Sequence, residues 1–574
     1  MKRKILYFLL TFTLITGCEL LDYSEQSFYD DPEDIFSNFN RTSQFLADIY
    51  NRLPTDYSSV DGAMRSAASD EAEYVKQNTD VQEFTNGQWS AFNSLDANWA
   101  NYYSGIRSVN LFLEYINGRT YEEYQYIDTY EDEMARFDKY QYEARFLRAF
   151  FYFELAKRYG DVPMPDGVID DIVVINSIEK TPFDNIITYI VNECDAIRDS
   201  LPTDWNDMIY LETGRVTAGA VQTLKVRSLL YSASPLHNPT NDVTKWEAAA
   251  AAANEFLINT DFNYSFENVY YNSNDMSQGV FNNRESNELI FERRQGNANS
   301  FERSNFPMGF EGANGNATCP SQNLVDAYQT IDGYDVIIDD NGTWSAPGSV
   351  VFDPASPYDN RDLRFQQTII VNGSDWKGST VETFYGGANG LPVADATPTG
   401  YYLKKHVRQD IEISGSNVTT KEHMWVLFKL GEIYLNYAEA VNEAYGPTNV
   451  PGGFLMDATT ALNNIRSRPA AGLPPVFGLT KDELRSVIIR ERQVELAFED
   501  HRFWDVRRWQ LFDESNPDNV TEDLYGIEIL EDNGSFTYSK IIVDDRLWDD
   551  KMYLYPIPYK ETNINSNLTQ NPGW

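Results

Sequence analysis

The chain has 574 residues, of which 42% are hydrophobic, and this is enough to bury a large core. Its 87 Asp and Glu residues against 46 Lys and Arg give a formal net charge of −41, which repels nucleic acid and anionic lipid headgroups. Aromatic residues make up 14% of the chain, with 37 Tyr and 11 Trp. Because the faces of these rings stack on sugars, the composition favours a carbohydrate ligand.

The first residues predict an export signal rather than part of the fold. A basic start over residues 1–4 is followed by an apolar run over residues 5–16, which is too short to span a bilayer. The run ends in Leu-Ile-Thr-Gly-Cys, which resembles a bacterial lipobox. We predict a lipoprotein signal peptide over residues 1–17, lipidation of Cys18 and a lipid-anchored tether over residues 18–40. An ordinary secretory peptide is the alternative.

Residues 41–260 are expected to form a helical region. Apolar periodicity predicts helices over residues 41–53 and 99–116, and the polar, aromatic stretch between them reads as a functional insertion. Gly160 and Pro163 end a strongly helical run that begins at residue 140. Further helices are predicted to end at residues 201, 230 and 257. Another helical pair is predicted over residues 425–444 and 459–468, within the C-terminal region 421–574.

Residues 261–420 differ in composition from the helical regions. They are rich in Asn, Gly, Ser and Pro, with short β-like runs before Asn-Gly turns at residues 341–342 and 372–373. We predict irregular loops with small β-hairpins that pack on the helices. The helical pairs resemble degenerate tetratricopeptide units, which stack to bury one another's apolar faces.

A charged stretch over residues 484–509 lacks Gly and Pro and is predicted to form one long helix. Arg492, Glu495, Glu499 and Arg502 share one face of it, among apolar residues, so we expect a paired ionic network. The two glutamates could instead act as the acid/base pair of a glycosidase. The structural interpretation is favoured, because each glutamate has an arginine one helical turn away and would hold it.

The run ERQVELAFEDHRFWDVRRW at residues 491–509 resembles the signature of the SusD/RagB family, with Asp500 where the family usually has glycine. Residues 143–163, 287–291, 360–364, 400–404 and 554–574 also resemble family motifs. The resemblance implies a mainly α, SusD-like fold of about four tetratricopeptide pairs with a long loop-rich insertion before the last pair. It also implies a surface-exposed lipoprotein of the outer membrane that binds oligo- or polysaccharide and partners a SusC-like TonB-dependent transporter.

Family members place the glycan site on the first insertion and on the middle one. The matching stretches give Tyr74, Trp89 and Trp344 as candidate stacking rings, and they give hydrogen-bonding candidates at Asp70, Asn297 and Arg303. Two of the rings have a structural alternative: Trp89 could be a loop anchor, and Trp344 could be the packing residue of a hairpin. Asp70 could instead cap a helix.

No catalytic motif is present, and the four histidines show no metal-ligand spacing, so we predict no enzyme activity, no metal and no cofactor. The Asp-Asp-Asn-Gly run at residues 339–342 predicts a turn rather than a calcium loop. A disulfide between Cys194 and Cys319 stays open. The hypothesis is capture of a glycan for a transporter. The alternatives are binding of peptide or another nutrient, a role in assembling the transporter complex, and a glycosidase.

Overall fold

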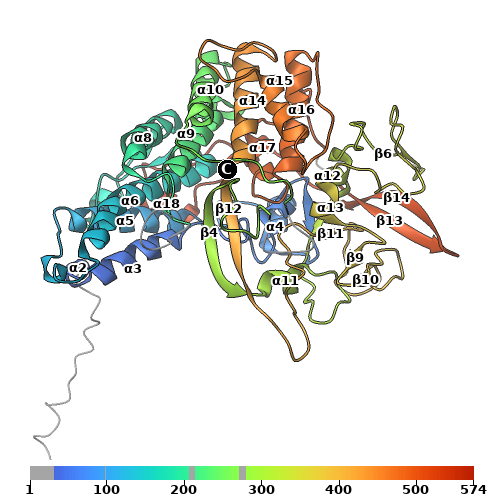
Figure 1. Cartoon of the computed structure of the whole chain (residues 1–574), viewed down its shortest axis with the longest axis horizontal. Coiled ribbons are helices and arrows are strands. Elements are labelled where there is room, and N and C mark those ends of the chain that lie inside the picture. The colour runs from blue at the N-terminus through green and yellow to red at the C-terminus, as the bar shows by residue number, and fades with distance from the viewer. Residues whose placement is uncertain (1–31, 97, 206–213, 271–278, 340, 522) are drawn as a thin grey trace, which may run out of the picture.

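The computed structural model describes residues 32–574 except 97, 206–213, 271–278, 340 and 522. The predicted signal peptide, Cys18 and most of the predicted tether lie outside the described residues. Helices form one side of the molecule, and a loop-rich body with small strands forms the other (Figure 1). The mainly α architecture with small hairpins agrees with the prediction.

The helical side is a row in which each long helix packs on the next. Helix α5 packs on α6, α6 on α8, α8 on α9, α9 on α10, and α10 on α14, which also contacts α15 and α16 (Figure 1). Helix α10 therefore joins α14 directly, across the insertion that separates them in sequence. The bounds of the row, including the N-terminal helices, are α2 Pro32–Phe36, α3 Phe39–Tyr50, α5 Asn98–Ile116, α6 Tyr130–Tyr159, α8 Phe183–Ile197, α9 Ala218–Ala233, α10 Val243–Ile258, α14 Leu430–Tyr445, α15 Ala458–Arg466 and α16 Lys481–Glu495.

Local sequence sets where many of these helices begin. The side chains of Asn38, Thr217 and Asp242 accept hydrogen bonds from backbone N–H groups in the first turns of α3, α9 and α10. Helix α16 begins with a capping box between Thr480 and Glu483. These caps satisfy N–H groups that have no partner inside the helix. The starts predicted at residues 41, 246 and 484 fall two or three residues inside the observed helices, and the run predicted from residue 140 begins at Tyr130.

Two predicted helices were wrong in part. Residues 421–429 form a strand, β12 (Lys421–Lys429), so the helix predicted from residue 425 begins only at Leu430. The single helix over residues 484–509 is two helices, α16 and α17 (Arg502–Arg508). The chain turns between them because Phe498 and Asp500 each adopt a left-handed backbone with φ of +59°. That conformation costs energy for any residue but glycine, which explains why glycine is usual at the position of Asp500.

The strands form antiparallel pairs. The longest are β4 (Leu289–Ala298) with β12, and β13 (Leu524–Asp532) with β14 (Ser535–Asp544). An Asn-Gly turn at residues 533–534, with φ of +51° and +84°, closes the second pair. Both ribbons were missed, although that turn signal was in the sequence. The hairpin predicted around residues 337–345 is confirmed as β6 (Ile337–Ile338) with β7 (Trp344–Ser345).

The remaining elements are short. Within the insertion they are α11 Ser300–Asn305, α12 Gln322–Ala327, α13 Phe365–Thr368, β5 Thr318–Pro320, β8 Ile369–Ile370, β9 Asp375–Trp376, β10 Ser379–Thr380 and β11 Tyr402–Leu403. Outside it they are α4 Asp80–Glu83, α7 Ile172–Ile175, α18 Tyr559–Ile564, β1 Ala72–Tyr74, β2 Val162–Pro163 and β3 Lys180–Thr181. β1 pairs with β5, β2 with β3, β8 with β11, and β9 with β10, so the two-residue strands make hairpins and bridges rather than a sheet.

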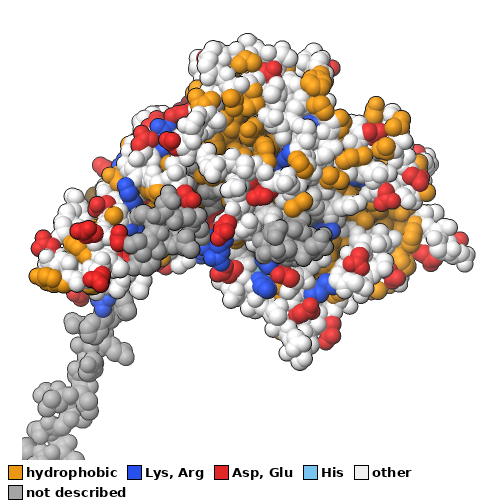
Figure 2. Space-filling view, viewed as in Figure 1, with side chains coloured by type: hydrophobic (Ala, Val, Ile, Leu, Met, Phe, Trp, Pro, Cys, Tyr) orange, Lys and Arg blue, Asp and Glu red, His pale blue; other side chains and the backbone are white. Residues whose placement is uncertain are grey.

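Two large hydrophobic clusters fill the interior. One lies among the helices, and the other joins the insertion to the region around Phe498. Cys194 lies in the first cluster and Cys319 in the second, and both are free and buried. On the visible face, acidic side chains are scattered rather than gathered, and hydrophobic side chains reach the surface over β13 and β14 (Figure 2).

Candidate functional site

The three predicted stacking rings are buried, which corrects that part of the prediction. Tyr74, Trp89 and Trp344 are only 3%, 4% and 3% exposed, so none offers a face to a ligand. Trp89 makes edge-to-face contacts with Phe84, Tyr555 and Trp574. Trp344 lies on β7 and contacts the rings of Tyr358 and Tyr538. The roles of loop anchor and hairpin packing residue, which the sequence left open, are the ones that the structure supports for Trp89 and Trp344.

The predicted hydrogen-bonding residues divide between interior and surface. Asp70 is buried and accepts two hydrogen bonds of 2.7 Å from the guanidinium of Arg502, so it is neither a cap nor free for a sugar. Asn297 is exposed at the end of β4, and Arg303 is half-buried on α11, where it donates to Asn299. Of the three predicted hydrogen-bonding residues, Asn297 and Arg303 are therefore the ones with polar groups near the surface.

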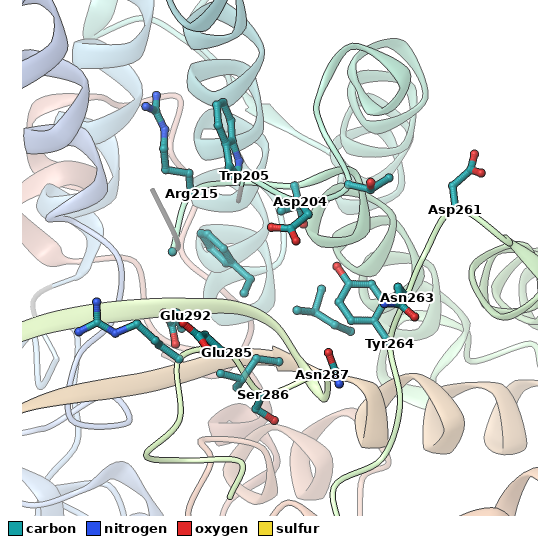
Figure 3. Close-up of a pocket in the computed structure, with 17 residues that line it drawn as sticks. Asp204, Trp205, Arg215, Asp261, Asn263, Tyr264, Glu285, Ser286, Asn287 and Glu292 are labelled. Carbon is teal, nitrogen blue, oxygen red and sulfur yellow. The ribbon is translucent and has the colours of Figure 1, made fainter. Parts of the chain in front are cut away.

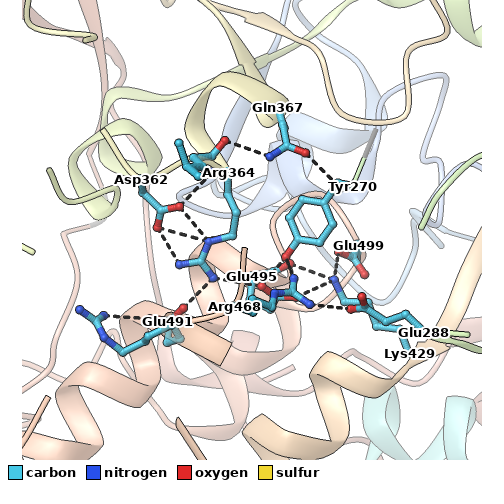
Figure 4. A network of polar contacts seen from close by, with 12 residues as sticks. Tyr270, Glu288, Asp362, Arg364, Gln367, Lys429, Arg468, Glu491, Glu495 and Glu499 are labelled. Atoms are coloured by element: carbon cyan, nitrogen blue, oxygen red, sulfur yellow. Dashed lines mark hydrogen bonds and ion pairs between the residues drawn. The ribbon is translucent and has the colours of Figure 1, made fainter. Parts of the chain in front are cut away.

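The signature glutamates belong to a buried ionic network (Figure 4). Glu495 is fully buried and pairs with Arg364 at 3.0 Å, Arg468 at 2.7 Å and Lys429 at 3.2 Å. Glu499 pairs with Lys405 and Lys429, each at 2.7 Å. Burial alone would raise the pKa of Glu495, but Arg468, Lys429 and Arg364 outweigh it and hold that pKa well below its usual range.

The network supports the structural interpretation but with other partners than predicted. Arg492 pairs with Asp505 at 3.0 Å, and Arg502 pairs with Asp70, so neither arginine holds Glu495 or Glu499. The chain turns after Glu495, so Glu499 and Arg502 do not continue the helix, whereas Arg492 and Glu495 share α16 but each bind partners from other segments. The cations on the two glutamates come mainly from other segments. Arg364 and Lys405 belong to the insertion, so the network fastens the insertion to the helical row.

The insertion also forms the surface hollow that best suits a sugar, and we call it the insertion groove. It has a volume of about 660 Å³. The rings that line it include Phe384 of the insertion and Phe536 and Tyr538 of β14, and the ring centres of Phe384 and Phe536 are 5.7 Å apart. Phe536 is 40% exposed. Sugar C–H faces pack on such rings.

Polar side chains line the rest of the insertion groove. They are Asp359, Gln366, Asp375, Glu382 and Lys404. Burial lowers the pKa of Lys404, and the nearby Asp375 carboxylate opposes that shift. Three carboxylates against one lysine disfavour an anionic ligand, whereas hydroxyl groups could donate to the carboxylates and accept from the lysine.

Trp344 connects the predicted site to the insertion groove. Its ring lies 5.9 Å from that of Tyr538, so it supports one wall from behind. Trp344 itself is buried, so the structure keeps the predicted segment next to the groove but removes this ring as a ligand contact. The turn at residues 533–534 was the available signal for the hairpin that carries Phe536 and Tyr538, whereas Phe384 had no sequence signal.

A second, smaller pocket lies where the helical row meets β4 (Figure 3). Its volume is about 190 Å³. Trp205, Arg215 and Asp204 lie on one side of it, and Glu285, Ser286 and Glu292 lie on the other (Figure 3). We call it the acidic pocket, because four carboxylates line it and its two arginines pair with Glu143 and Glu422 outside it; the carboxylates are Asp204, Asp261, Glu285 and Glu292.

Among the residues that the structure describes, no three or more His, Cys, Asp or Glu residues are grouped so that they could hold a metal ion. Within the same residues, no helix has the length and apolarity needed to cross a bilayer. In the predicted turn at residues 339–342, the Asp339 carboxylate accepts from the N–H groups of Asn341 and Thr343 at 2.9 Å each.

Comparison with known proteins decides the family. The model described as "SusD family" matches residues 250–574, which is more than half of the chain. The chain belongs to the SusD family. A second model, described as "Starch-binding associating with outer membrane", matches residues 21–222. The insertion groove is lined by residues within the first of these matches.

Individual relatives are distant but extend over most of the chain. A SusD-like protein P2 from Formosa agariphila is 24% identical over 75% of this chain and 73% of its own length. A SusD-like protein from Bacteroides fragilis is 26% identical, with a TM-score of 0.75 over 94% of this chain and 98% of that one. A SusD-like carbohydrate-binding protein from the same species is 21% identical, with a TM-score of 0.70 over 93% of this chain and 100% of that one.

Proposed function

We propose that the chain is a non-catalytic, cell-surface lipoprotein that captures a neutral oligo- or polysaccharide in the insertion groove and passes it to a SusC-like TonB-dependent transporter. The observation that carries the binding role is the pair of neighbouring rings, Phe384 and Phe536, in one groove with hydrogen-bonding side chains. Family membership and the descriptions of the matched relatives support a carbohydrate ligand. The lipobox supports anchoring through Cys18 in the outer membrane.

Absence of catalysis is part of the proposal. Glu495 and Glu499 are buried and bound by cations, so they are poorly placed to exchange protons with a substrate. Prolonged incubation with a bound polysaccharide should release no reducing ends. Release of reducing ends that tracks the purified chain would overturn this part of the proposal and revive the glycosidase alternative.

The test uses the soluble chain from residue 19 in native gels that contain a panel of neutral and anionic polysaccharides. We expect one neutral glycan to retard it. Phe536→Ala and Phe384→Ala should each weaken the affinity about tenfold, or ~1.4 kcal/mol, because each removes a stacking face. Phe477→Ala is the matched control, since this ring is 73% exposed but lies outside the groove. Retardation that survives both groove variants would move the site elsewhere.

The acidic pocket supports a second candidate, the binding of a basic peptide. Glu292 pairs with Arg294 at 2.8 Å, but the pocket has more carboxylates than arginines, so it would attract Lys and Arg side chains. The adjacent Trp205 and Tyr264 would contact the aliphatic stems of these side chains. Calorimetric titration with a tri-lysine peptide, alongside Asp261→Asn and Glu285→Gln, tests this candidate. Binding that both variants weaken, together with no retardation by any glycan, would favour the peptide.

A further inference from the structure

An unusual apolar surface lies on the helical row, away from the insertion groove. Helix α7 consists of four consecutive apolar residues, and Ile172, Val173, Val174 and Ile175 are 66%, 73%, 47% and 38% exposed. Asp171 caps the helix by accepting from the N–H of Val173 at 2.8 Å. This short capped helix therefore leaves much of its aliphatic surface uncovered by the residues that the structure describes. Contiguous exposed apolar residues of this kind commonly mark a contact surface.

The exposed helix borders a groove between α5 and α18, which lie near one another in Figure 1. The groove has a volume of about 380 Å³. Trp99, Tyr103 and Pro163 line it from the helical row, and Ile564, which is 57% exposed, lines it from α18. We call α7 and this groove together the α7–α18 face.

The face is held in shape by the C-terminal segment. Asn565 donates to the carbonyl of Ile178 at 2.8 Å, and Asn567 donates to the carbonyl of Ser177 at 2.7 Å. Tyr103 donates to the carbonyl of Pro163 at 2.8 Å across the floor. These bonds fix the loop after α7 against α18 and the floor of the groove, so a partner would meet a preformed surface.

The margin of the face is acidic. Five carboxylates lie in or next to the segments that line the face, Asp166, Asp170, Asp171, Glu179 and Glu561, and they outnumber the cations Arg107, Lys180 and Lys560. Arg107 pairs with Asp170 at 2.8 Å. A second copy would bring another net −41 chain against this margin, and anionic headgroups would be repelled likewise. The charge therefore selects a partner whose apolar surface is edged by Lys or Arg.

We propose that the α7–α18 face docks a protein partner through a segment that inserts aliphatic or aromatic side chains into the groove and sets basic residues against the margin. This interface is separate from the glycan site, so the chain can hold ligand and partner at once. An extracellular loop of the transporter is the segment with this role, and that identification alone rests on the proposed function.

The primary test uses a fluorescent peptide of alternating Leu and Lys and the soluble chain from residue 19. Fluorescence anisotropy should show binding that weakens with added salt, and a Leu/Glu peptide should not bind. Val173→Asp and Ile564→Asp should each weaken binding at least tenfold. Both variants add negative charge, which by itself would attract the peptide, so a loss reports the apolar contact. Val350→Asp is the matched control, because this valine is 91% exposed within the insertion.

Each outcome decides for or against the face. Equal affinity of the wild type, Val173→Asp and Ile564→Asp for the Leu/Lys peptide would overturn the proposal, as would equal loss in Val350→Asp. Retardation by the glycan should stay unchanged in all three variants, which shows that they fold. The second test is the amount of TonB-dependent transporter that co-purifies with the full chain from its host's outer membrane. Loss in Val173→Asp with glycan binding intact assigns the face to the transporter, whereas failure of glycan binding in the wild type overturns only the proposed function.

Discussion

The helical row and the insertion are stabilised in different ways. The row is held by apolar stripes such as that of α8, where Ile186, Ile190 and Ile197 are buried at helical spacing. The insertion has strands of mostly two or three residues, and it is held by charged side chains that reach across the chain, such as Arg364 and Lys405. Because charged contacts as well as a hydrophobic cluster attach the insertion, rings such as Phe384 can stay partly exposed at its surface.

The largest effect on this difference is expected from removing the carboxylate charge of Glu495 at the centre of the network. Glu495→Gln should lower the free energy of unfolding by about 3–5 kcal/mol, because Arg364, Arg468 and Lys429 would stay buried without their shared carboxylate. Denaturant unfolding measures the change. Glu311→Gln is the control, since Glu311 is an exposed glutamate of the insertion and should change stability by less than about 0.5 kcal/mol. Equal effects would mean that the network does not hold the insertion.

The same network predicts a pH dependence. The pKa of Glu495 is held below its usual range in the folded chain, so its contribution is complete above the unfolded carboxyl pKa of about 4.3 and is lost as the pH falls below it. The stability gap between the wild type and Glu495→Gln should therefore narrow as the pH falls from 7 to 3. Unfolding curves of both proteins at each pH measure that gap. A constant gap would show that the carboxyl titrates alike in the folded and unfolded chains.

A buried and an exposed ring beside the insertion groove, Trp344 and Phe536, sharpen the comparison. Trp344→Ala should cost about 3–5 kcal/mol, because it leaves a cavity behind Tyr538 and Tyr358. Glycan binding should fall as well, through movement of the groove wall. Trp344→Phe should retain more of both. Phe536→Ala should instead lower glycan affinity with little change in thermal unfolding. A Trp344→Ala chain with unchanged stability and no glycan binding would restore Trp344 as a ligand contact.

The sequence predicted the row better than the insertion for a physical reason. Helix starts and apolar stripes are local, so Thr480 with Glu483 and the stripe of α8 were visible without the fold. The partners of Glu495 lie 27, 66 and 131 residues away, at Arg468, Lys429 and Arg364, and no spacing rule reaches them. The prediction of stacking rings was wrong for a similar reason, because the exposure of a ring depends on how distant segments of the chain pack together.

The smallest expected effect concerns the turn between α16 and α17. Asp500→Gly should change the free energy of unfolding by no more than about 1 kcal/mol. Glycine relieves the backbone strain at a φ of +59°, which stabilises the fold. It also removes the hydrogen bond that Ser58 donates to Asp500 at 2.8 Å and raises the conformational entropy of the unfolded chain, and both effects are destabilising. Phe498 has the same φ and provides the contrast.

The ring of Phe498 is fully buried, so Phe498→Gly should lower the free energy of unfolding by about 3–5 kcal/mol or more, although glycine relieves the same backbone strain there. Denaturant unfolding of the two variants separates backbone strain from packing at positions two residues apart. A large loss in Asp500→Gly would mean that its carboxylate holds the turn through Ser58 and the nearby Arg65, 3.8 Å away. The aspartate would then replace the usual glycine by adding a contact that glycine cannot make, and the turn would belong to the charged attachment of the insertion rather than to the helical row.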